Sequence, residues 1–224
     1  MTKNSQLVKK LVGLATLTAL VFVLQYFSGY IKFGSVSITL ALVPIAMGAI
    51  LYGPLAGFFL GAFMGFIVIL APDTQAVFMP VNAAATIFLC LLKSGLAGLA
   101  AGFIFKLFAH FGKKTENENK AKALFATGII VSALIVPLIN TSLFILGATL
   151  FFMSVFGDFM VLINAVITVN FAIEIVVSAL LSPVLVTVIK ILTNKYDLGF
   201  ANDFSRFNKL EENDNLEVEE VLQN

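Results

Sequence analysis

Long apolar segments follow one another along most of the chain, and they limit the folds that it can adopt. Hydrophobic residues make up 59% of the 224 residues, and charged residues make up only 12%. Soluble domains carry about 25% charged residues, and a helix needs about 20 mainly apolar residues to cross a bilayer. The sequence therefore predicts an integral membrane protein of the all-α class.

We expect six transmembrane helices joined by short loops. The last two are the hardest to separate, because residues 142–170 are almost continuously apolar and Gly157–Asp158 is the one turn-like break there. A membrane domain over residues 1–195 would precede an acidic cytoplasmic tail over residues 196–224, which is rich in Asp and Glu. The expected helices run roughly over 10–28, 37–52, 54–71, 82–110, 123–150 and 164–192.

The lysines predict the orientation of these helices, because short cytoplasmic loops carry an excess of Lys and Arg. Under this arrangement both termini are cytoplasmic, and the loops 29–36, 72–81 and 151–163 face outward. Only Lys32 falls on the outer side. Ten lysines fall on the inner side, namely Lys3, Lys9, Lys10, Lys106, Lys113, Lys114, Lys120, Lys122, Lys190 and Lys195.

Two ionisable residues, Lys93 and Glu174, lie within expected helices. A charge inside the hydrocarbon costs several kcal/mol unless it is paired or lines a polar cavity. Lys93 follows Asn82 by 11 residues, which is about 16 Å along a helix and near the middle of the membrane. The two residues either neutralise each other as a structural pair or mark a polar pocket.

Further polar residues favour the pocket. The three C-terminal helices carry them, whereas the three N-terminal helices carry almost none. Polar side chains can simply hold helices together, but three helices that bring them to similar depths predict a ligand site open to the outside. Phe78, Phe144 and Phe171 lie at a depth from which they could stack on a ligand. The candidate substrate-binding residues are Asn82, Thr86, Lys93, Asn140, Thr141, Asn164, Asn170 and Glu174.

Small residues repeat every four positions in two of the N-terminal helices. Glycines occupy positions 53, 57, 61 and 65, and alanines occupy 15 and 19. Such stripes let helix backbones approach closely in lipid. Internal packing is the simpler interpretation of the glycines, and the Ala15/Ala19 pair is either a packing contact or a docking surface for another membrane subunit.

The motifs of several function classes are absent from the sequence. It has no phosphate-binding loop ending in GK[ST], which excludes ATP hydrolysis by this chain. Cys90 and His110 are the single Cys and His, so neither a disulfide framework nor a metal cage is expected. The net charge of +1 gives no argument for nucleic-acid binding. We therefore expect neither an enzyme nor a cofactor.

Three segments carry a resemblance to a known family. They are VPIAMGAILYGPLAGFFLGAFMGF (residues 43–66), the Ala15/Ala19 pair, and KSGLAGLAAGFIFKL (residues 93–107). Together they make residues 10–192 similar to the substrate-binding S components of energy-coupling factor (ECF) vitamin transporters. The resemblance implies a six-helix protein of the bacterial cell membrane that binds a vitamin from outside in a pocket formed by its last three helices.

The resemblance also implies partners. An S component docks on a transmembrane coupling (T) subunit with two ATPase subunits, and the Ala15/Ala19 pair matches the position of that contact. The missing ATPase motif agrees with energy supplied by a partner. NTSLF (140–144) and NFAIEI (170–175) resemble the pantothenate-type branch, and a buried Lys93 suits a carboxylate. Folate, riboflavin, pyridoxine-like compounds and cobalamin remain open.

Two other functions compete with this one. An autonomous secondary transporter could use Lys93 and Glu174 as an ion-coupling pair, although the two halves of the chain show no convincing inverted repeat. A scaffold protein could use the glycine stripe only for packing. Ligand binding without transport in the absence of partners would favour the S component.

Overall fold

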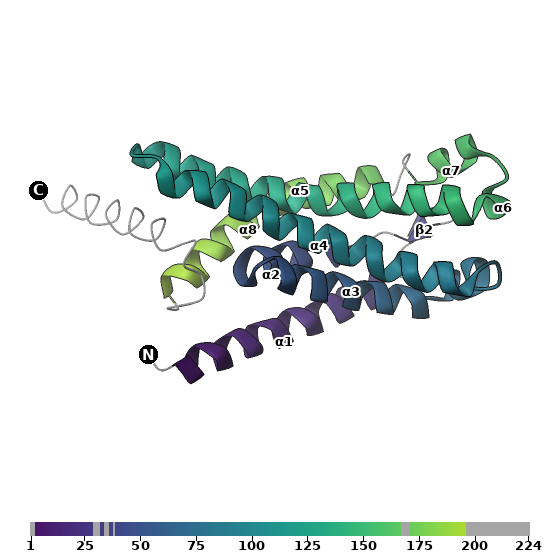
Figure 1. Cartoon of the computed structure of the whole chain (residues 1–224), viewed down its shortest axis with the longest axis horizontal. Helices are drawn as coiled ribbons and strands as arrows, with labels where there is room; N and C mark the ends of the chain where they lie inside the picture. Colours follow the sequence, from purple (N-terminus) through teal and green to yellow (C-terminus); the bar gives the residue numbers. More distant parts are fainter. Residues whose placement is uncertain (1–2, 29–31, 34–35, 38, 167–170, 196–224) are drawn as a thin grey trace, which may run out of the picture.

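The computed structural model describes residues 3–28, 32–33, 36–37, 39–166 and 171–195. Helices dominate it and run mostly along one long axis (Figure 1). The elements are α1 (Lys3–Ser28), β1 (Lys32–Phe33), β2 (Val36–Ser37), α2 (Leu42–Tyr52), α3 (Pro54–Leu70), the π-helix η1 (Thr74–Phe78), α4 (Ala83–Lys114), α5 (Glu118–Phe151), α6 (Met153–Phe156), α7 (Phe159–Val166) and α8 (Ala172–Lys195).

Four helices of the described chain are long and apolar enough to cross a membrane: α1, α4, α5 and α8. Helices α2 and α3 are also apolar but are shorter. The 11 residues of α2 rise only about 16 Å, whereas the hydrocarbon core is about 30 Å thick. The membrane character expected from the sequence is confirmed, and a count of six spans stays a prediction.

Several expected boundaries are wrong. The first helix begins at Lys3 rather than near 10, the fourth ends at Lys114 rather than near 110, and the fifth begins at Glu118 rather than near 123. The second helix begins at Leu42 rather than near 37, because Lys32–Phe33 pairs with Val36–Ser37 in an antiparallel hairpin. The backbone N–H of Leu40 then donates to the Ser28 hydroxyl at 3.1 Å and ties this segment to the end of α1. Residues expected in the outer loop 151–163 instead form α6 and most of α7. Of the last expected helix, 164–192, the structure describes the end of α7 and α8, and residues 167–170 lie outside the described part.

The glycine stripe is an internal packing surface. A Cβ added at Gly57, Gly61 or Gly65 would overlap the carbonyl oxygen of Gly98, Ser94 or Cys90, respectively. Helices α3 and α4 therefore meet backbone to backbone, which only glycine permits. This contact fixes the rotation of α4 about its own axis and so decides which face its polar residues present to α5.

A sharp turn joins α2 to α3. Gly53 has φ of 94°, in the left-handed region that favours glycine, and Pro54 opens α3. Helix α2 lies mostly buried and contacts α1, α3, α4, α5 and α8. The largest apolar core surrounds it, with Ile45, Leu60 and Met64 fully buried.

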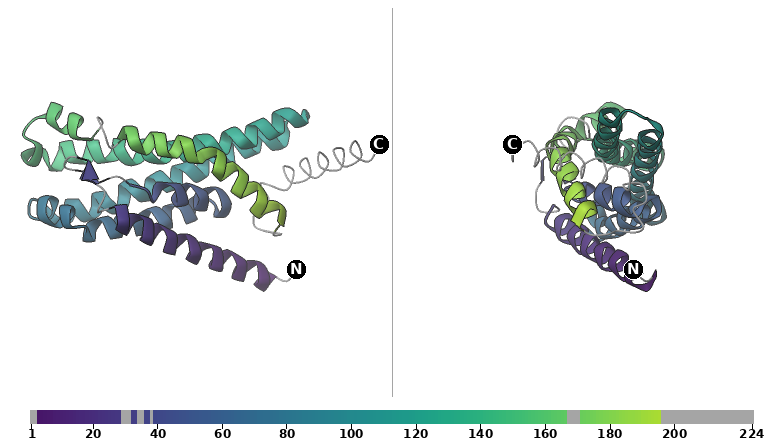
Figure 2. Two further views of the ribbon diagram at one scale, coloured as in Figure 1. Left: turned by 180° about the vertical axis from the view of Figure 1, so that it is seen from behind. Right: turned by 90° about the vertical axis from the view of Figure 1, so that its left-hand side faces the viewer.

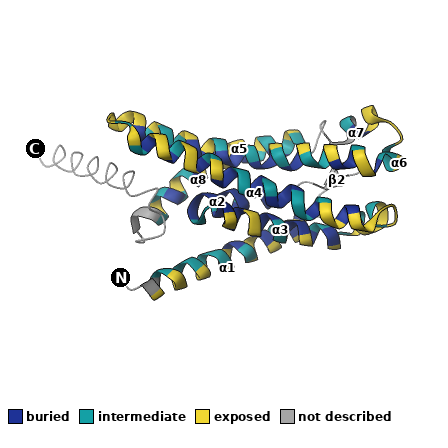
Figure 3. Ribbon diagram, viewed as in Figure 1, coloured by how far each residue is buried: buried dark blue, intermediate teal, exposed yellow. Residues whose placement is uncertain are grey.

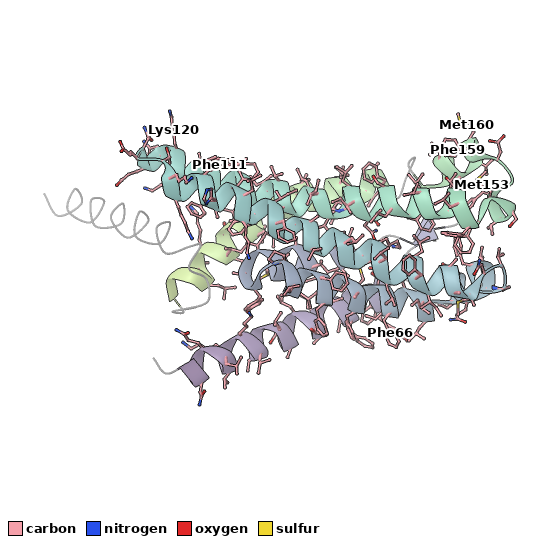
Figure 4. All side chains as sticks on the ribbon, viewed as in Figure 1. Phe66, Phe111, Lys120, Met153, Phe159 and Met160 are labelled. Carbon is pink, nitrogen blue, oxygen red and sulfur yellow. The ribbon has the colours of Figure 1, made fainter. Side chains whose placement is uncertain are left out.

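The outer surface of the bundle is apolar, as lipid requires. Leu55, Leu150 and Leu180 are among the exposed large hydrophobic residues, and exposed positions run along the outward faces of the helices (Figure 3). Phe66 and Phe111 project outward from α3 and α4 (Figure 4). Lys120 lies at one end of the long axis, and Met153, Phe159 and Met160 lie at the other (Figure 4).

Different segments of the chain lie at the two ends of the bundle. The start of α1, the junction of α4 with α5 and the end of α8 gather at one end (Figure 1). The hairpin strands, α6 and α7 gather at the opposite end (Figure 1). The segments expected on the inner side thus share one end and those expected on the outer side share the other; which end faces the cytoplasm stays a prediction. Residues 196–224, the expected acidic tail, lie outside the described residues.

Candidate substrate-binding site

Lys93 and Ser94 lie side by side on the buried face of α4. Lys93 is 8% exposed, and Ser94 is fully buried. The Lys93 Nζ donates to the Asn140 Oδ1 at 3.0 Å, and the Ser94 hydroxyl donates to the same oxygen at 3.2 Å. Because a lysine can only donate, the side-chain oxygen of Asn140, not its nitrogen, must face α4. One amide of α5 thus receives two donors from α4.

The next residue on α5 connects this group to α8. The Thr141 hydroxyl donates to the Glu174 Oε2 at 3.4 Å. Thr39, just before α2, also hydrogen-bonds to Glu174. Glu174 is 6% exposed and lies in the first turn of α8, where the positive end of the helix dipole favours a carboxylate. Polar groups from α4, α5, α8 and the segment before α2 therefore meet in one buried cluster.

Lys93 and Glu174 do not form a direct contact pair. Among the residues that the structure describes, no ion pair within 4 Å joins them, and Lys93 binds Asn140 instead. Asn140 and Thr141 supply the hydrogen bonds that each ionisable group needs when it leaves water. The structural-pair interpretation is therefore replaced by a network with two polar residues between the charges.

An aromatic group borders this network. The Lys93 Nζ lies 5.9 Å from the centroid of the Phe144 ring, within the range of a cation–π contact. Phe78 of η1 meets Phe144 edge to face at 6.0 Å, and it meets Phe152 at 5.3 Å and Phe156 at 6.2 Å. These rings join the segment 72–81 to the C-terminal part of α5 and to α6. Through Phe144 they form an apolar group that borders the cluster at Lys93.

The sequence model for the substrate-specific component of ECF transporters matches residues 9–186. The chain belongs to this family. Proteins of this family bind small-molecule substrates and work with T and ATPase modules, so the family is one of transporter components rather than of enzymes. No characterised protein and no solved structure gives a significant match to the chain.

Of the predicted site residues of this S component, four meet in the cluster: Lys93, Asn140, Thr141 and Glu174. Two others do not join it. Asn82 is exposed and caps α4, accepting from the Ala85 N–H at 3.0 Å. The Thr86 hydroxyl is buried but donates to the Asn82 carbonyl at 2.8 Å, one turn back on its own helix.

The remaining two predicted residues cannot be placed in the site. Asn164 belongs to α7, but its side chain is outside the described part of the structure, as is the whole of Asn170. Their roles stay predictions. The four-residue spacing from Asn170 to Glu174 would suit a shared helix face.

Two polar residues of the cluster, Ser94 and Thr39, escaped the prediction, and so did a buried polar residue of α1. Ser94 sits beside Lys93 and could have been chosen by adjacency alone. Thr39 gave no periodic signal, because it lies outside any helix. Gln25 of α1 is 7% exposed, and its side-chain carbonyl oxygen has no hydrogen-bond partner. Gln25 lies one helical turn before Ser28, whose hydroxyl accepts a hydrogen bond from the Leu40 N–H. The sequence signal for Gln25 was a polar amide side chain in an otherwise apolar helix.

The expected docking residues are on the opposite side of the S component from α5. Ala15 and Ala19 are exposed on α1. They line a groove of about 760 Å³ between α1 and α3, together with Phe59 and Phe63. Helix α1 diverges from the bundle toward its N-terminus (Figure 2).

Proposed function

We propose that this S component captures a small water-soluble vitamin that bears a carboxylate, with pantothenate as the best candidate. The observation that carries the proposal is the buried Lys93, held by Asn140 in a network to which three transmembrane helices contribute. A lysine at such depth implies a function, since a methionine would fill the same space without the cost of burying an ionisable group.

The donors of the cluster suit a carboxylate. Lys93 has three N–H donors and uses one on Asn140. Because Asn140 turns its oxygen toward α4, its amide nitrogen remains to donate to a ligand. Charge-assisted hydrogen bonds to a carboxylate are about twice as strong as neutral ones. These groups would bind the acidic end of the vitamin.

Acceptors lie on the other side of the cluster. Glu174 is held by Thr141 and Thr39, and a carboxylate with lone pairs to spare can accept from ligand hydroxyl or amide groups. Pantothenate carries a carboxylate, an amide and hydroxyl groups along one chain. The order of Lys93, Asn140, Thr141 and Glu174 across the site fits such a molecule.

The ligand would enter from outside through the aromatic cover made by Phe78, Phe144, Phe152 and Phe156. This requires six membrane-crossing segments with α2 and α3 completing the bundle, both termini in the cytoplasm, and a bacterial cell membrane as the location. The lysine-rich junction of α4 and α5 supports the assignment of that end to the cytoplasm.

Transport then needs partners. Ala15 and Ala19 present a small-residue surface at a groove, which allows a helix of a T subunit to approach closely. Two ATPase subunits attached to that T subunit would supply the energy, and docking would drive release of the vitamin inside.

Isothermal titration of the detergent-purified protein with pantothenate tests the binding role. We expect Lys93→Met to weaken binding by about 10- to 100-fold, because a hydrogen bond to a charged group contributes about 1.5–3 kcal/mol. Lys114→Met changes an exposed lysine of the same helix and should leave the affinity unchanged. Folate, riboflavin and pyridoxine serve as competitors. Wild-type affinity in Lys93→Met would make the lysine structural.

An ion-coupled secondary transporter is the second candidate. It is favoured by one observation, the presence of two buried ionisable groups, Lys93 and Glu174, in one cluster. Proteoliposomes that contain this chain alone separate the two functions. Pantothenate flux driven by an ion gradient without any partner would establish the secondary transporter, whereas binding without flux supports the S component.

A further inference from the structure

Two hollows adjoin each other along the side of the molecule where α1 meets α3. The first, about 360 Å³, is lined by Lys10 of α1, Tyr52 at the end of α2 and Lys106 of α4. The second is the apolar groove of about 760 Å³ beside Ala15 and Ala19. Leu14 and Phe59 line both. Together they form one amphipathic groove with a basic end and an apolar length.

The basic end is assembled from parts far apart in the sequence. Lys10 and Lys106 come from the first and fourth helices, and the α2–α3 turn places Tyr52 in the same hollow. Gly13 allows the approach of α1, since a Cβ there would overlap the Tyr52 hydroxyl. Lys10 lies near the start of α1 and Lys106 lies in the last third of α4. The start of α1 and the α4–α5 junction, which carries Lys113, Lys114, Lys120 and Lys122, lie at the same end of the bundle (Figure 1).

The apolar length has the character of lipid-facing surface. Phe59 is 56% exposed, Leu11 is 57% exposed and Phe22 is 50% exposed. Apart from Thr18, the residues that line it are apolar. A hydrocarbon chain would match this surface, whereas water would not.

We propose that the groove binds one anionic phospholipid of the inner leaflet. Its phosphate lies between Lys10 and Lys106 with the Tyr52 hydroxyl as a further donor, and an acyl chain follows Leu14 and Phe59 into the apolar length. Charge complementarity selects this occupant: basic pockets between transmembrane helices on the cytoplasmic side suit anionic head groups, and lysine is a common phosphate ligand.

The site has a consequence for transport that rests on the proposed function. A T-subunit helix at Ala15 and Ala19 would occupy the same apolar length as the acyl chain. The lipid and the T subunit therefore exclude each other, and the lipid covers the docking surface of the free S component. Lipid binding itself does not depend on the identity of the vitamin or on docking.

Native mass spectrometry of the full chain tests the proposal. The protein is equilibrated in detergent with equimolar phosphatidylglycerol and phosphatidylcholine. We expect one phosphatidylglycerol to be retained in preference to phosphatidylcholine. In the double variant Lys10→Gln/Lys106→Gln its affinity should fall by about tenfold or more, since each lysine near a phosphate adds about a fivefold factor. Equal retention of both lipids by the wild type would overturn the proposal.

A matched control variant distinguishes a specific lipid site from nonspecific attraction of the lipid to surface lysines. Lys114→Gln/Lys120→Gln removes the same two charges at exposed positions of the α4–α5 junction, and it should retain the lipid like the wild type. If both double variants lose phosphatidylglycerol equally, no specific site exists. Circular dichroism melting of both variants establishes that they are folded.

Two further experiments test separately whether the acyl chain and the head group contribute to binding. Ala19→Phe fills the groove while both lysines remain, and it should lower phosphatidylglycerol retention. Glycerol phosphate, which has the head-group chemistry without an acyl chain, should compete poorly even in large excess. Full displacement by glycerol phosphate, or unchanged retention in Ala19→Phe, would show a soluble-phosphate site instead and would overturn the lipid assignment.

Discussion

At the scale of residues, Asn140 is the centre of the buried network. Its Oδ1 accepts from both Lys93 and Ser94, while its neighbour Thr141 reaches Glu174. Two consecutive residues of α5 thus face two different helices. A substitution here affects both the position of the lysine and the donor that we assign to the ligand.

Replacing Asn140 by Ala should therefore weaken vitamin binding. We expect a loss of about 1–3 kcal/mol, the cost of leaving buried polar partners unsatisfied, measured by isothermal titration. Asn119→Ala, at an exposed position near the start of the same helix, is the control and should bind as the wild type does. Unchanged affinity in Asn140→Ala would move the ligand away from this network.

The site residues could be predicted only in part from the sequence. Lys93, Asn140, Thr141 and Glu174 were identifiable because a polar residue in an apolar helix is costly. Asn82 caps α4 outside the cluster, and a helix-capping asparagine looks the same in sequence as a ligand-binding one. Thr39 and Gln25 depend on how α1 and the segment before α2 pack, which no local pattern encodes.

At the scale of elements, the close contact of α3 with α4 sets the site. The stripe of glycines on α3 rests on the carbonyl groups of α4, and Ser94, which binds Asn140, is itself one of the contacted residues. Rotation or displacement of α4 would separate Lys93 from α5. The packing role of these glycines thus supports the function without their touching the ligand.

Enlarging Gly61 should separate the two helices. A Cβ at this position would overlap the Ser94 carbonyl oxygen, so Gly61→Val is expected to lower the melting temperature and to weaken vitamin binding, with an overpacking cost of about 1–3 kcal/mol. Thermal unfolding in detergent and titration measure the two effects. Phe66→Leu, on the exposed face of α3, is the control. A Gly61→Val protein as stable as wild type would contradict the close-packing account.

The ends of the helices could not be predicted from hydropathy alone. Hydropathy indicates the apolar part of a helix, but α4 continues to Lys114 and α5 begins at Glu118, beyond the apolar residues. Asn117 caps α5 by accepting from the Lys120 N–H, so a polar segment still forms helix. Conversely, the apolar stretch after 151 breaks at Gly157, whose φ of 72° favours a turn.

At the scale of the whole molecule, the polar network and the proposed docking surface occupy different sides. The polar network lies among α4, α5 and α8, while α1 stands at the periphery with little of its surface buried (Figure 3). A peripheral helix with an exposed small-residue pair can contact a partner without disturbing the network. Binding and docking should therefore be separable by mutation.

The double variant Ala15→Leu/Ala19→Leu tests this separation. We expect vitamin uptake by cells that also contain the T and ATPase subunits to fall to background, because bulky side chains prevent close helix approach, while titration gives wild-type affinity. Thr16→Leu, exposed on the same helix but outside the groove, should leave uptake intact. Loss of binding in the double variant would exclude a docking role.

The most direct test of the central claim is mass spectrometry of the small molecules released from the purified protein. The Lys93–Asn140 network predicts one vitamin with a carboxylate, in about equal molar amount to the wild-type protein and absent from folded Lys93→Met. Pantothenate is the compound that we expect. A wild-type protein that releases no vitamin and binds none from a panel, or one that releases the same compound when Lys93 is replaced, would contradict this account.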